Sequence, residues 1–411
     1  MRDKEWSATT RLASAPERRE GGTTSLIPLA YNLRSLRVRR TTTVLTMFGI
    51  ALVTLVVVML LSLVSGIRQS LELAADPRVW IVLSRGINSE AESYLPREQF
   101  DILRTRPEIA TNDGADSLIS GELVVPFNAA IKRPANQFYP ATLRGVNAVA
   151  RLVHPKLKVI EGHWPSPGRQ EMAIGRKLLQ KFPELGIGTT FRYGHRNWTI
   201  VGVIADAGSV RESEFWTDLD VLEQDAHFQN GFSSLHVVLK PGMEESFERA
   251  LTADARITVD LFNERDYYAE QALVADRLRI LVVVVSAIIG LGAAFGGMNT
   301  MYAAVLRRAR ELGVLRALGF GRGSVILSIL VESELLALAG GLLGIVAALA
   351  LMFATGFDQH MLSIGALTFS SRFSLSACTG GIFSAFLVGA AGGLLPAARA
   401  AHMSVSESLR L

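Results

Sequence analysis

The stretch RRARELGVLRALGFGRGS (307–324) decides how the chain is organised, because it lies between two long apolar segments. Five of its residues are arginine and one is acidic. Its leucines and Val314 recur every three or four positions, which predicts a short amphipathic helix. Glycines at 319, 321 and 323 predict the end of that helix and a turn. We therefore expect a short basic helix that connects two apolar segments.

The apolar segments are long enough to cross a membrane. Of the 411 residues, 49% are hydrophobic and 19% are charged. A transmembrane helix needs roughly 20 apolar residues, and three longer windows contain no charge: 41–67, 280–306 and 373–398. A fourth segment, 325–353, contains only the charged residues Glu332 and Glu334. The sequence therefore predicts four transmembrane helices.

The positions of the arginines predict the orientation of these helices. Arginines cluster before the first span, within 307–324 and after the fourth span, whereas 356–371 contains no Lys or Arg. The positive-inside rule then places both termini and the basic helix in the cytoplasm. The long region between the first two spans must lie on the other side of the membrane.

This region, 67–275, has the pattern of a soluble α+β domain, because short β-branched runs and helical patterns intermix without strict alternation. Cys378 is the only cysteine and lies in the fourth span, so the domain must be stable through its own core. Expected strands are 79–85, 235–240 and 257–262, with a hairpin at 191–205; expected helices are 97–104, 171–182 and 244–253. The pattern from 264 to 278 predicts a helical stalk that continues into the second span.

The expected fold is an α-helical membrane protein with four transmembrane helices and a large extracytoplasmic α+β domain inserted between helices 1 and 2. Its parts are a disordered cytoplasmic tail (1–24), an amphipathic helix with transmembrane helix 1 (25–66), the inserted domain with its stalk (67–275), transmembrane helix 2 (276–306), the basic helix (307–324), transmembrane helix 3 (325–353), an extracytoplasmic loop (354–374), transmembrane helix 4 (375–398) and a cytoplasmic tail (399–411).

No catalytic constellation is recognisable in the sequence. GFGRGS (319–324) lacks the lysine of a P-loop, and HExxH, CxxC and GxSxG do not occur. The seven histidines are scattered and suggest no pair of metal ligands. Glu212, Glu214, Asp218 and Asp220 could bind a cation, but the favoured interpretation is a solvated loop and an exposed strand face. We expect no enzyme activity, cofactor or metal in this chain.

Two features of the third span predict helix packing. A carboxylate within a span usually faces protein or water, so we expect Glu332 to bond a neighbouring helix, although a substrate or proton role stays open. Gly340 and Gly344 form a small-xxx-small motif, as do Gly389 and Gly393, and such motifs let helices approach closely. They predict tight packing within the chain or across a dimer.

The basic helix itself has two interpretations. It is either a loop that is basic only to fix topology, or a docking element whose apolar ridge fits a groove on a cytosolic partner. That ridge would consist of Leu312, Leu315 and Leu318, with Val314 beside it.

Together these segments resemble the permease subunits of FtsX/MacB-type ABC transporters, also called type VII or mechanotransmission systems. The resemblance is carried by LAYNLRSLRVRRTTTVLTMFGIALV (29–53), RARELGVLRALGFGRGSVILSILVESELLALAGGLLG (308–344) and LLPAARAAHMSVSESLR (394–410). The segments LRGV (143–146), VIEGHW (159–164), MAIGRKLLQKF (172–182) and WTIVGVI (198–204) are similar to landmarks of a MacB-like periplasmic core domain.

The resemblance identifies 307–324 as the helix that couples to an ATPase. The residues expected to carry this coupling are Arg310, Glu311, Leu312, Gly313, Leu315, Arg316, Leu318 and Gly319. Glu332, Gly340 and Gly344 match the pattern of the third span. ATP and Mg would be bound by the partner ATPase and not by this chain.

The resemblance implies a dimer of permeases with two cytosolic ABC ATPases, in the cytoplasmic (inner) membrane of a bacterium, with lipid contacts and no nucleic acid. Such a machine would export or extract an amphiphilic substrate (lipid, lipoprotein, peptide or drug), with a possible periplasmic adaptor or outer-membrane channel. The alternative is a signal relay that controls a periplasmic cell-wall hydrolase. The size and landmarks of the outer domain favour transport over the relay, and the 307–324 signature disfavours an unrelated receptor.

Overall fold

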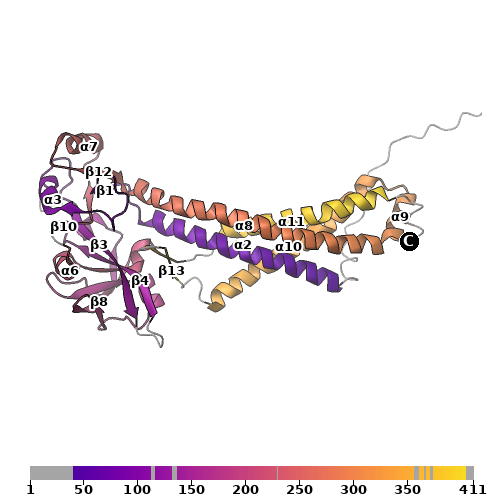
Figure 1. The fold of residues 1–411 in the computed structure, drawn as a ribbon, viewed down its shortest axis with the longest axis horizontal. Coiled ribbons are helices and arrows are strands. Elements are labelled where there is room, and N and C mark those ends of the chain that lie inside the picture. Colours follow the sequence, from indigo (N-terminus) through magenta and orange to yellow (C-terminus); the bar gives the residue numbers. More distant parts are fainter. Residues whose placement is uncertain are drawn as a thin grey trace, which may run out of the picture. The chain divides into compact units, whose positions relative to one another are not determined.

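The computed structural model describes residues 40–112, 116–131, 137–228, 230–355, 361–364, 367–370 and 374–403. The expected disordered tail, the amphipathic helix before residue 40 and the last eight residues lie outside this part of the chain. Figure 1 shows the fold, which consists of long helices and one sheet-based domain.

Four helices are long and apolar enough to cross a membrane in the part of the chain that the structure describes. They are α2 (Arg40–Ala74), α8 (Glu264–Arg307), α10 (Arg322–Thr355) and α11 (Leu375–His402). A helix suits this environment because it satisfies its backbone hydrogen bonds within one segment. The inserted domain follows α2 and precedes α8, which confirms the predicted fold class. The stalk and the second span form a single helix, α8.

The described residues form two compact units, and each of the four helices contributes to both. One unit contains the residues up to Ile50, Gly290–Gly341 and the residues from Ala385 on. The other contains Ala51–Ile289 and Leu342–Ser384, and therefore includes the whole inserted domain.

Glycines allow the long helices to pack closely. In the first unit, a Cβ on Gly340 would lie 2.8 Å from the carbonyl oxygen of Met47 in α2. In the second unit, a Cβ on Gly344 would lie 2.5 Å from the carbonyl oxygen of Ala51. Both contacts are between helices of one chain.

The inserted domain is built on a ten-stranded sheet in the order β12-β1-β11-β3-β4-β9-β6-β8-β5, with β7 paired to β8. The pairs β4/β9 and β6/β8 are parallel and the others antiparallel. The strands are β1 (Val79–Ser84), β3 (Ile119–Ile131), β4 (Gln137–Val146), β5 (Lys158–Gly162), β6 (Glu171–Gly175), β7 (Thr190–Tyr193), β8 (Arg196–Ala205), β9 (Glu214–Asp218), β11 (Ser234–Val238) and β12 (Val259–Asn263).

Shorter elements complete the described chain. The helices are α3 (Arg97–Leu103), α4 (Ala150–Val153), α5 (Arg176–Lys181), α6 (Leu219–Asp225), α7 (Glu244–Ala253), the 3-10 turn η1 (Val210–Ser213) and α9 (Ala309–Ala317). Two small antiparallel pairs join β2 (Leu95–Pro96) to β10 (Gly231–Phe232), and β13 (Met361–Ile364) to β14 (Leu367–Ser370).

The two faces of the sheet have different chemistry, because successive side chains of a strand point to opposite faces. In β1, Val82 packs into the main apolar core, which also contains Trp198 and Phe215. Ile81 and Leu83 point the other way and pack with residues of α2 and α8. The ends of α2 and α8 therefore pack on this second face of the sheet.

One prediction about the inserted domain is wrong. The segment 171–182 was expected to be a single helix, but Glu171–Gly175 is strand β6 and only Arg176–Lys181 is helical. β6 is buried between β8 and β9, so pairing on both sides overrides the helical spacing of the local sequence. The other expected strands and helices of the domain are present, including the hairpin β7–β8.

Candidate functional site

A stripe of charged side chains crosses the second face of the sheet. Glu122 of β3, Arg144 of β4, Glu214 of β9 and His236 of β11 come from four neighbouring strands. Their neighbours in sequence, such as Leu123 and Leu143, point into the apolar core instead. The alternation of each strand therefore gathers the charges on one face, where all four are buried.

Arg144 lies at the centre of this stripe and bonds three carboxylates. Its guanidinium lies 2.6 Å from Glu122, 2.8 Å from Glu214 and 3.0 Å from Glu90. The planar fork of arginine presents five N–H donors, so one side chain can serve several carboxylates at once. A lone charge in this position would be very costly, because all four groups are removed from water.

Two histidines extend the network. His154 Nε2 lies 2.8 Å from Glu122 Oε1, and His236 Nε2 lies 2.6 Å from Glu90 Oε1. Glu122, His154 and His236 offer ligand atoms within 4.8 Å of one another, a grouping that could hold a metal ion. In the structure these atoms bond other members of the network, so the group acts as part of an ion network.

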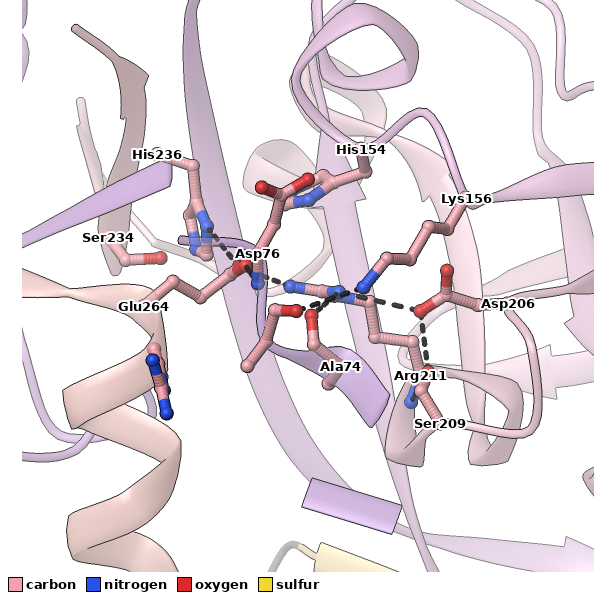
Figure 2. A network of polar contacts seen from close by, with 12 residues as sticks. Ala74, Asp76, His154, Lys156, Asp206, Ser209, Arg211, Ser234, His236 and Glu264 are labelled. Atoms are coloured by element: carbon pink, nitrogen blue, oxygen red, sulfur yellow. Dashed lines mark hydrogen bonds and ion pairs between the residues drawn. The ribbon is translucent and has the colours of Figure 1, made fainter. Parts of the chain in front are cut away.

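The network reaches both α2 and α8 through Arg211 and Glu264. Arg211, on η1, donates to the carbonyl oxygen of Ala74 at 2.7 Å and forms an ion pair with Glu264, the first residue of α8 (Figure 2). Glu264 in turn accepts the backbone N–H of Asp76 at 2.7 Å. His236 Nδ1 lies 3.5 Å from Glu264, which links this region to the stripe on the sheet.

Burial and neighbouring charges set the protonation of these groups. Burial by itself would raise the pKa of Glu122, but His236, His154 and Arg144 hold that pKa well below its usual range. Burial would lower the pKa of His236, yet Glu122, Glu264 and Glu90 raise it to about 10. Burial dominates for Glu214 and raises its pKa, with a further rise from the neighbouring Glu90, although Arg144 acts in the opposite direction. At neutral pH, His236 is therefore a cation inside the domain.

Sequence reasoning missed this site. Glu212 and Glu214 were interpreted as part of a solvated acidic run, but both are buried: Glu214 bonds Arg144, and Glu212 lies 2.9 Å from Arg176. The histidines suggested no pairing, whereas the rings of His154 and His236 lie 5.0 Å apart. The available signal was a single charged residue within each of several mainly apolar strands, such as Glu122 in β3, Arg144 in β4 and His236 in β11. It has meaning only once the strand order is known.

The predicted basic helix is α9, which begins one residue after Arg308. Leu312 and Gly313 are buried, and Leu315 packs partly into the same apolar cluster. Val314 and Leu318 are 46% and 72% exposed. The predicted ridge is therefore divided: its first two leucines pack inward, and Val314 of α9 and Leu318, the residue that follows α9, are the exposed apolar side chains.

Polar contacts hold both ends of α9. Arg308 forms ion pairs with Glu332 of α10 at 2.9 Å and with Glu311 at 3.4 Å. Glu332 thus bonds the residue that caps the start of α9. At the other end, Arg316 donates to the carbonyl oxygen of Met403. Arg310, Glu311 and Gly319 are exposed.

Comparison with protein families matches most of the chain. Residues 43–254 match the MacB-like periplasmic core domain, and residues 283–405 match the FtsX-like permease C-terminal domain. An uncharacterised ABC transporter permease of Methanocaldococcus jannaschii is 24% identical over 408 residues, covering 93% of this chain and 97% of the relative.

Other matches cover a smaller part of this chain. The macrolide export ATP-binding/permease protein MacB 1 of Yersinia pestis is 26% identical over 251 residues, which are 57% of this chain but 36% of that protein's length. The crystal structure of the periplasmic region of MacB from Actinobacillus actinomycetemcomitans aligns with a TM-score of 0.38 at 12% identity, covering 49% of this chain and 94% of that one.

Proposed function

Because the chain belongs to the FtsX/MacB-type permeases of ABC transporters, we propose that it couples ATP hydrolysis by a separate cytosolic ATPase to motion of its inserted domain. The work done would be the export or extraction of an amphiphilic substrate, such as a lipid, lipoprotein, peptide or drug. The inserted domain would lie outside the cytoplasm, and α9 would lie inside, as the arginine distribution favours.

The observation that carries the proposal is the surface of α9. An exposed apolar pair, Val314 and Leu318, stands beside the exposed charges Arg310 and Glu311. Apolar anchors flanked by charges are typical of a helix that docks in a groove of a partner. The ion pair between Arg308 and Glu332 ties this helix to α10. A force applied to α9 would therefore act directly on a membrane helix.

The proposal is tested by changing the exposed anchor. Leu318→Asp should reduce recovery of the ATPase with the purified permease by at least about tenfold, the effect of losing roughly 1.4 kcal/mol of binding. The charge would face solvent in the free permease, so the chain should still fold and elute normally from gel filtration. Leu315→Asp is less informative, because Leu315 also packs inside the protein.

Leu152→Asp provides the matched control, since Leu152 is also an exposed leucine but belongs to the inserted domain. It should leave ATPase recovery unchanged. Full ATPase recovery and activity in Leu318→Asp would contradict the assignment of α9 as the docking helix.

We also propose a homodimer of this chain with two ATPase subunits, in the cytoplasmic membrane. Mild crosslinking in native membranes, followed by purification and mass spectrometry, identifies the partners. An ATPase recovered with an adaptor or outer-membrane channel supports export. An ATPase recovered with a cell-wall hydrolase would point to the signal relay, and recovery without any ATPase would contradict the proposal.

A further inference from the structure

Two cationic side chains of the inserted domain bond the C-terminal end of α2. A helix leaves its last carbonyl groups without partners, and they carry partial negative charge. α2 has no basic residue in its own last turn. Instead, Arg211 donates to the carbonyl oxygen of Ala74 (Figure 2). Lys156 donates to the carbonyl oxygens of Ala75 at 2.9 Å and Leu73 at 3.4 Å.

The first residue of α8 meets the same guanidinium. Glu264 pairs with Arg211 through one carboxylate oxygen and accepts the N–H of Asp76 through the other. Asp76 lies in the connection between α2 and β1. One arginine side chain thus bonds the last residue of α2 and the first residue of α8.

Several contacts hold the side chain of Arg211 in place. Arg211 is 2% exposed, lies 3.4 Å from Asp206, and stands 5.6 Å from the ring of Tyr268. Glu212 accepts the backbone N–H groups of Asp206 and Gly208, which closes the loop around η1. The guanidinium is therefore held by the body of the domain and not by the helices alone.

We propose that Arg211 is a positioning residue that locks the ends of α2 and α8 to the sheet, so that movement of either helix is transferred to the inserted domain. A buried ion pair stabilises a fold little compared with apolar packing of the same volume. The advantage of the Arg211 ion pair is geometric, because the planar guanidinium fixes the directions of its bonds to Ala74 and Glu264. The inference deepens the proposed function and rests on it for the direction of force.

The role of Arg211 in fixing α2 and α8 to the sheet can be tested without any ATPase. Spin labels are placed on Arg192→Cys in β7 and Glu270→Cys in α8, both exposed positions, in a Cys378→Ser chain reconstituted in nanodiscs and diluted with unlabelled chain. Double electron–electron resonance measures the distance between them. Arg211→Lys keeps the charge but loses the fork, and should broaden the distance distribution about twofold or more. Glu264→Gln should broaden it as well.

Arg256→Met is the matched control, because Arg256 lies in the connection between α7 and β12 and forms a largely exposed ion pair with Asp254 at 2.7 Å. It should leave the distribution as narrow as in the unmodified chain. Equally narrow distributions in Arg211→Lys and Glu264→Gln would overturn the inference, because α8 would then stay fixed to the sheet without the bonds of Arg211.

A second measurement separates this inference from the proposed function. With the ATPase and ATP present, labels at Arg192→Cys of the two subunits should change their separation in the unmodified chain. Arg211→Lys should abolish that change while ATP hydrolysis continues. If ATP moves nothing even in the unmodified chain, the proposed function fails, and the width measurement still decides the role of Arg211.

Discussion

At the scale of single residues, Arg144 and His236 hold the charged face of the sheet together. Arg144 neutralises carboxylates from three segments, and His236 adds a second positive charge beside Glu90 and Glu122. Removing one member would leave its partners buried with one bond missing, which is more costly than losing one exposed ion pair. The domain therefore depends on the complete set.

This network predicts a loss of stability at alkaline pH. Burial would lower the pKa of His236, but Glu122, Glu264 and Glu90 raise it from its ordinary value of 6.5 to about 10. Its contribution is thus complete below pH 6.5 and is lost as the pH rises to about 10. Hydrogen exchange of β3 and β11, followed by mass spectrometry, should show protection falling across this range.

His236→Gln provides the comparison. This variant should be less protected at neutral pH and should lack the part of the pH dependence that belongs to the imidazole. An identical decline in the variant and the unmodified chain would show that other groups cause the alkaline change.

At the scale of elements, α10 packs on α2 through glycines that permit close approach. A Cβ on Gly344 would lie 2.5 Å from the Ala51 carbonyl oxygen and 2.7 Å from Thr54 Cβ. Both neighbours belong to a helix and cannot move independently. We therefore expect Gly344→Leu to destabilise the protein by about 1 to 3 kcal/mol, as overpacking typically does.

Thermal unfolding in detergent checks this expectation through a lower midpoint temperature. Gly292→Leu is the control, since a Cβ on Gly292 of α8 would meet no atom within 4 Å. Equal midpoints for the two variants would show that the contact of α10 with α2 tolerates a large side chain.

The elements differ in how far sequence could predict them. Spans were predictable because lipid requires long, uniformly apolar segments, which is a local signal. β6 was not, since Glu171–Gly175 is a strand only through its partners β8 and β9. The ion network was hidden for the same reason: Glu90, Glu122, Arg144, Glu214 and His236 are far apart in sequence and meet only after the sheet forms.

At the scale of the whole molecule, the distribution of arginines predicts that the inserted domain and α9 are exposed on opposite sides of the membrane. In a Cys378→Ser chain, Arg192→Cys in the inserted domain should react with a membrane-impermeant maleimide in cells whose cytoplasmic membrane is intact. Leu318→Cys in α9 should react only after that membrane is permeabilised. Both positions are exposed, so accessibility within the protein is matched. Labelling in the reverse order would overturn the expected topology.

The pairing of β1 with β12 has a consequence for how such a protein can evolve or be redesigned. These are the first and last strands of the inserted domain, and Trp80 lies opposite Asn263. The chain therefore leaves α2 and returns to α8 at neighbouring points, the condition under which one domain is readily inserted into another. The segment between residues 78 and 264 can be regarded as an interchangeable head. A different head with adjacent termini and an arginine that reaches Ala74 and Glu264 could be grafted onto the same helices.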